Sequence, residues 1–168
     1  DAWGLGDLTM RRVADELGVK AGALYYHMPN KQSLLAEIAD VILTPVAVPR
    51  ATDTGEWLRQ WSHHLRDALL AHRDGAELVS SATALGMGAV DVTLAARELL
   101  AGKGYPEPAA TMATFLHFIL GHVMAEQTRV QLAALGVLEG FDEHASRTDF
   151  SHGVELLVRG VTTSGSAT

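Results

Sequence analysis

Cysteine is absent from the 168 residues of this sequence, which excludes disulfide bonds, thiolate metal sites and cysteine nucleophiles. A chain without cysteine suits a reducing compartment, so we expect a cytoplasmic protein. Long apolar runs are absent as well: none reaches the roughly 18 residues that a spanning helix requires, and the polar N-terminal stretch lacks the basic and apolar regions of a signal peptide. The sequence therefore predicts neither membrane insertion nor secretion.

An excess of basic charge is also missing, since the formal net charge is −7. This balance excludes a protein that coats nucleic acid without regard to sequence, because that task needs a broad basic surface. Within residues 8–31, however, there are four basic residues and only two acidic ones. An excess so small is more often an ordinary solvated face, yet it leaves room for a local nucleic-acid contact.

Period-2 alternation, the mark of strands, is nearly absent, whereas apolar residues recur at i, i+3 and i+4 along most of the chain. We therefore predict an all-α fold, and 168 residues exclude two large domains. The expected helices cover about residues 9–17, 20–28, 30–43, 55–72, 74–84, 87–103, 106–134 and 148–162. A connection with two prolines at 44–55 divides the chain into a small domain, residues 1–46, and a larger one, residues 47–168.

The two short helices near the N-terminus have the spacing of a helix-turn-helix. Thr9 is placed to cap the first helix, and Gly18 stands where the chain must turn sharply. Small Ala14 falls where the helices would cross, with Val19 and Leu24 following. Taken alone, this spacing is more often that of an ordinary helical hairpin.

The stretch LTMRRVADELGVKAGALYYHMPNKQSLL, residues 8–35, resembles the DNA-binding region of the tetracycline repressor (TetR) family of transcriptional regulators. Further resemblance to the tetracycline repressors themselves lies in residues 68–78, 116–127 and 150–160, whereas residues 79–110 are supported only by their helical pattern. Family members carry a helix ahead of the motif. Here only its tail is expected, at about Asp1 to Trp3, so we expect the natural N-terminus to be missing.

The resemblance implies that the second short helix reads DNA, and the residue types suggest their roles. Thr9 offers a hydroxyl to a phosphate, Arg11 can reach a phosphate or a guanine edge, and Lys31 clamps the DNA backbone. At the tip of the recognition helix, alanine and glycine supply only methyl contacts and close approach, so base readout is thin. The expected DNA-binding residues are Thr9, Arg11, Lys20, Ala21, Gly22, Ala23, Tyr25, Tyr26, His27 and Lys31. For Tyr25, packing between the helices is an equal alternative.

The resemblance also implies that the larger domain dimerises and encloses an effector pocket whose occupation shifts the helix at 30–43. The dimer would use helices 106–134 and 150–160. The helix at 106–134 is apolar nearly all round, which predicts burial by the core and by a second subunit. Expected pocket residues are Trp57, Trp61, Leu65, Val79, Met87, His117, Leu120, Gly121 and Met124. A tryptophan and methionine stripe at helical spacing is also what a plain core would show.

The polar contacts of a magnesium–tetracycline site do not carry over, because Trp61 stands at a polar position of the family and VSSATALG lacks the expected histidine and arginine. We therefore expect a bulkier, largely apolar or aromatic effector. His117 aligns with a pocket histidine, although it would serve equally in a core.

The sequence shows no arrangement of residues that would carry out catalysis. The spacings between histidines do not suit a metal pair. His122 and Glu126 stand at i, i+4, and we interpret them as a helix-surface ion pair. We expect no cofactor and no metal. The favoured function is a ligand-responsive repressor that binds palindromic operator DNA as a homodimer. An all-helical small-molecule-binding enzyme and a pure dimerisation module are the alternatives.

Overall fold

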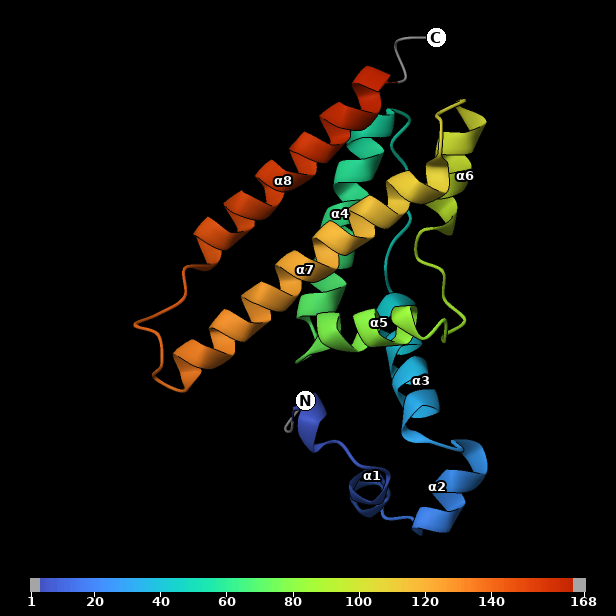
Figure 1. Ribbon diagram of the computed structural model, residues 1–168, viewed down its shortest axis with the longest axis vertical. Coiled ribbons are helices and arrows are strands. Elements are labelled where there is room, and N and C mark those ends of the chain that lie inside the picture. The colour runs from blue at the N-terminus through green and yellow to red at the C-terminus, as the bar shows by residue number, and fades with distance from the viewer. Residues whose placement is uncertain (1–3, 165–168) are drawn as a thin grey trace.

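The computed structural model describes residues 4–164, and within that range every regular element is a helix, as the sequence predicts. The elements are η1 (Leu5–Asp7), α1 (Met10–Glu16), α2 (Ala21–His27), α3 (Lys31–Leu43), α4 (Thr54–Leu70), α5 (Gly75–Ala84), α6 (Leu94–Gly102), α7 (Pro108–Ala134) and α8 (Glu143–Ser164). Figure 1 shows an elongated molecule in which α1 and α2 form one end, α3 leads away from them, and α4, α6, α7 and α8 form the other end. The expected helix tail at Asp1 to Trp3 lies outside the described residues.

Local side-chain caps define the N-terminal helices. The Thr9 hydroxyl oxygen accepts a hydrogen bond from the Arg12 N–H at 3.2 Å, and the Asn30 carboxamide oxygen accepts one from the Ser33 N–H at 2.8 Å. Helix α1 ends at Glu16, and two residues later Gly18 adopts the left-handed conformation with φ of 65°. Its N–H bonds to the carbonyl of residue 15 and the next N–H to that of residue 14, the pattern of a Schellman cap. The predicted helix-turn-helix is confirmed.

Helix α3 joins this small unit to the larger one. It packs along α5 and against α4, and its inner face buries Leu34, Ile42 and Leu43. A second link lies beside it, because the Leu5 N–H donates to the Asp74 carboxylate at 2.9 Å. The two units therefore touch at the start of the described chain and along α3.

The larger unit is built around α4 and α7, which both pack against α5, α6 and α8. The search for unbroken apolar runs missed the high hydropathy of α7. One 18-residue window of this helix has mean hydropathy 1.3, so α7 is long and apolar enough, by length and composition alone, to cross a membrane. Buried core helices pass the same test, and a third of that window is buried here. Its outward face carries small and polar side chains such as Ala113, His117 and Gly121, and burial of this face by a second subunit stays a prediction.

Two predicted helix starts are wrong. The helix expected at 87–103 begins only at Leu94, because residues 86–93 form an irregular segment in which Gly86 and Gly88 adopt positive φ, 64° and 104°. The helix expected at 148–162 begins earlier, at Glu143, because the Asp142 carboxylate accepts the N–H of Ala145 at 2.9 Å and caps it.

Candidate nucleic-acid interface and effector cavity

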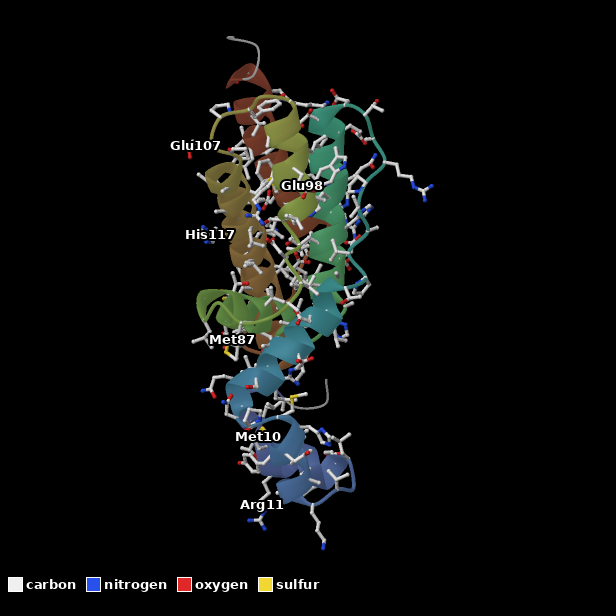
Figure 2. The ribbon with its side chains drawn as sticks, turned by 90° about the vertical axis from the view of Figure 1, so that its right-hand side faces the viewer. Met10, Arg11, Met87, Glu98, Glu107 and His117 are labelled. Atoms are coloured by element: carbon white, nitrogen blue, oxygen red, sulfur yellow. The ribbon has the colours of Figure 1, made fainter. Side chains whose placement is uncertain are left out.

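Exposed polar and aromatic side chains gather on α1 and α2, the end of the molecule farthest from α6 and α8 (Figure 1). Tyr26 is 86% exposed, and its ring meets that of His27 edge to face at 5.1 Å. Arg11 projects from the same end, as Figure 2 shows. Exposed aromatic rings beside an exposed cation are typical of a surface that contacts a partner.

The remaining predicted DNA-binding residues lie on the same unit. Thr9, Lys20, Gly22, Ala23 and His27 are exposed, whereas Ala21 and Lys31 are half-buried. The ammonium of Lys31 lies 3.4 Å from the Leu5 carbonyl oxygen, which accepts its hydrogen bond. Tyr25 is 50% exposed, so part of its ring packs and part faces solvent, and both interpretations of this residue stay open.

The predicted pocket tryptophans are buried in the core of the larger unit. Trp57, Trp61 and Leu65 lie on the inner face of α4, and Trp61 is 1% exposed. The indole N–H of Trp61 donates to the Val92 carbonyl oxygen at 3.1 Å, which satisfies its only polar atom. These side chains fill the centre of the helical bundle.

Two neighbouring cavities, one of which Trp61 lines, share walls from residues 86–93, which we call the strap. The larger, of about 310 Å³, is lined by Val79, Met87, Leu116 and much of the strap. The smaller, of about 230 Å³, is lined by Trp61, Val46, Val48 and Leu94. Leu43, Val90, Asp91 and Val92 line both. The strap was missed by sequence reasoning, although its paired glycines were a signal against a helix there.

Several expected pocket residues do not reach these cavities. His117 and Gly121 are exposed on α7, and Figure 2 shows His117 pointing away from the bundle. Phe115 and Ile119 of the same helix turn inward, which leaves positions 117 and 121 on the outer face, away from these two cavities. Their role in an effector site stays a prediction. Leu120 is buried and Met124 half-buried, but both pack in the core without lining either cavity.

A buried ion pair joins α4 to α7. Arg66 is fully buried, and its Nη2 lies 2.8 Å from both carboxylate oxygens of Glu126. Ser146 of α8 donates to the same carboxylate at 3.0 Å. The Phe150 ring lies 5.4 Å from the guanidinium carbon. Sequence reasoning missed this pair, although a charged residue next to Leu65 on the apolar face of α4 was a visible signal.

The expected surface ion pair of His122 and Glu126 is corrected, because Glu126 is 3% exposed and belongs to Arg66. The His122 ring lies 3.8 Å from that carboxylate. Burial lowers the pKa of His122, as it does that of His63, which avoids placing a second cation beside Arg66. In residues 4–164, no three or more histidines and acids gather into a group able to hold a metal ion.

Comparison with known proteins places both units in one family. Residues 3–38 match the family described as bacterial regulatory proteins, tetR family, and residues 48–139 match the tetracyclin repressor-like C-terminal domain. The class A tetracycline repressor of transposon 1721 from Escherichia coli is 32% identical, over 94% of this chain and 82% of that protein.

Solved structures agree. The crystal structure of Mycobacterium smegmatis BioQ is similar with 38% identity and a TM-score of 0.87, over 97% of this chain and 91% of that one. A structure of BioQ with its natural double-stranded DNA operator has 36% identity and a TM-score of 0.77, over 97% and 90% of the two chains. The chain belongs to the tetracycline repressor family of bacterial regulatory proteins.

Proposed function

We propose that this chain is a cytoplasmic transcriptional repressor that binds palindromic operator DNA as a homodimer and leaves it when a small, largely apolar or aromatic effector binds. The observation that carries the proposal is the exposed end of α1 and α2, where Arg11, Lys20 and Tyr26 project from a helix-turn-helix. The similarity to BioQ, whose structure holds an operator, supports it.

The same proposal divides the chain into a DNA-binding domain at 1–46 and an effector and dimerisation domain at 47–168. The two family matches, which end at 38 and begin again at 48, support this boundary. Selection of duplexes from a random pool by the purified protein tests the function. We expect recovery of a palindrome whose half-sites lie about 34–36 Å apart, the spacing of successive major grooves.

Replacing Arg11 by alanine should weaken binding to every duplex sequence, because a contact to phosphate carries no base information. The slope of log affinity against log salt should fall by about one unit, since one fewer counterion is released. Fluorescence anisotropy with the selected duplex and with a scrambled one measures both quantities. The control is Arg50→Ala, which removes the same charge from an exposed position in the connection between α3 and α4. A slope for Arg11→Ala equal to that of the control would remove Arg11 from the interface.

The homodimer is proposed to form through α7 and α8. On α8, Leu156 is 56% exposed, whereas Leu157 packs against the core. A charge at Leu156 should therefore disperse the dimer without disturbing the fold, because a buried unpaired carboxylate is strongly disfavoured. Sedimentation of Leu156→Glu at micromolar concentration should give a monomer. The exposed Leu85, which ends α5, gives the control: Leu85→Glu should remain a dimer.

The effector is proposed to enter the two cavities beside Trp61, which have apolar walls from Leu43, Val79, Met87 and Val90. Trp57 and Leu65 would support that wall from behind. The alternative, a small-molecule-binding enzyme, predicts that the protein converts the compound that it binds. Incubation with an effector found by thermal-shift screening, followed by mass spectrometry, separates the two functions, because a repressor returns its effector unchanged.

A further inference from the structure

The strap, residues 86–93, lies between the two cavities and forms a wall of each. Val90, Asp91 and Val92 line both, and Trp61 forms part of the floor on one side. The two cavities are therefore neighbours that one segment keeps apart. Moving that segment aside would join them into a single space of ligand size.

Hydrogen bonds at two places attach the strap to the rest of the molecule. From α3, the Asp40 carboxylate accepts the Ala89 N–H with both oxygens, at 3.0 and 2.8 Å, and the Val90 N–H at 2.9 Å. From α4, the Trp61 indole donates to the Val92 carbonyl at 3.1 Å. Hydrogen bonds to a charged acceptor are stronger than those between neutral groups, so the contact with Asp40 holds the strap more strongly than the contact with Trp61.

The strap is shaped to approach Asp40. Gly86 and Gly88 both adopt positive φ, and a Cβ atom on Gly88 would lie 3.1 Å from the Asp40 Oδ1 atom. Glycine at 88 therefore permits both the backbone conformation and the close approach of the carboxylate. The neighbouring Asp91 does not take part in this contact with α3. Its carboxylate accepts the Thr93 N–H and forms an ion pair with Arg97.

We propose that the strap closes a single effector cavity and that Asp40 is the positioning residue that holds it shut and ties it to α3. The proposal rests on the proposed function and names the regulation of that site. An open strap frees the N–H groups of Ala89 and Val90 and the indole N–H of Trp61 at an apolar wall. The ligand is therefore an apolar molecule that carries a hydrogen-bond acceptor, such as a carboxylate or carbonyl. Because α3 begins beside the recognition helix, an effector that opens the strap also loosens the attachment of the DNA-binding unit.

The first test measures closure and needs no natural effector. Asp40→Ala is compared with Glu37→Ala, which removes the same charge from an exposed position one turn earlier on α3. The probe is anilinonaphthalene sulfonate, an apolar dye with an acceptor group. Asp40→Ala should bind the dye at least about fivefold more tightly than the wild type, and the amide hydrogens of Ala89 and Val90 should exchange faster. Glu37→Ala should match the wild type in both measurements.

The second test measures coupling to DNA with the duplex selected by the wild type. Asp40→Ala should lose at least about fivefold in affinity, whereas Asp40→Asn, which keeps one acceptor oxygen, should lose less. Gly88→Ala strains the strap with the carboxylate intact, and it should show both effects even if Asp40→Ala does not fold. The proposal is overturned if dye binding and exchange of Asp40→Ala equal those of Glu37→Ala, or if DNA affinity is unchanged while dye binding rises. Failure of the wild type to select any duplex would instead overturn the proposed function, and the dye measurement would still decide on closure.

Discussion

Replacing Glu126 by alanine should destabilise the protein by about 3–5 kcal/mol, because it removes the buried carboxylate whose two oxygens both bind the guanidinium of Arg66. The Asp67 carboxylate, 3.6 Å from the Arg66 Nη1 atom, is largely exposed to solvent and replaces little of that interaction. Arg66 has no access to solvent, and its Nε and Nη1 atoms make no hydrogen bond in the described structure. The Glu126 carboxylate also accepts the Ser146 hydroxyl, so α8 loses an attachment in the same variant. Urea denaturation at fixed protein concentration measures the loss.

Two further variants separate charge burial from packing. The double variant Arg66→Met with Glu126→Leu removes both charges and restores apolar contact, so it should be more stable than Glu126→Ala alone. Glu155→Ala breaks two partly exposed pairs, with Arg59 at 2.8 Å and with Arg159 at 3.1 Å, and should cost much less because water solvates the remaining charges. A loss for Glu126→Ala no larger than that for Glu155→Ala would contradict the buried role of the pair.

The parts of the fold that the sequence predicted are those determined by neighbouring residues. Thr9 and Asn30 start helices through hydrogen bonds three residues ahead, and Gly18 ends one through its own backbone, so short-range patterns suffice. The exposed recognition helix followed from the same local motif. Its contacts with DNA stay predictions.

The parts that sequence reasoning missed depend on residues far apart in the chain. Asp40 and the strap are about 50 positions apart, and Arg66 and Glu126 are 60 positions apart. No periodicity within one helix reports such a pair. The apolar spacing of 87–93 favoured a helix, whereas the hydrogen bonds to Asp40 and the positive φ of Gly88 keep that segment out of a helix. The outward direction of His117 could not be predicted for a related reason, since it depends on which face of α7 meets α4.

Replacing Trp61 by alanine should also cost about 3–5 kcal/mol, the loss typical of truncating a buried aromatic side chain. Trp61 is 1% exposed and packs among the residues of the main core, although one edge lines the smaller cavity. Urea denaturation measures the loss of stability, and anisotropy with the selected duplex measures DNA affinity. Affinity should fall with stability, because α3 packs against α4 and depends on its position.

Trp61→Phe distinguishes the ring from its hydrogen bond. Phenylalanine keeps most of the buried volume but cannot donate to the Val92 carbonyl, so we expect a loss of only about 1–3 kcal/mol, the cost of leaving one buried acceptor unpaired. A loss below about 1 kcal/mol for Trp61→Ala would show that Trp61 borders an empty space large enough to absorb its removal, and the centre of the effector site would then move from the strap to α4. A large loss of stability for Trp61→Ala with a small loss for Trp61→Phe would show that the Trp61 ring is a fixed wall of the cavity. The strap would then be the wall that moves when the effector binds.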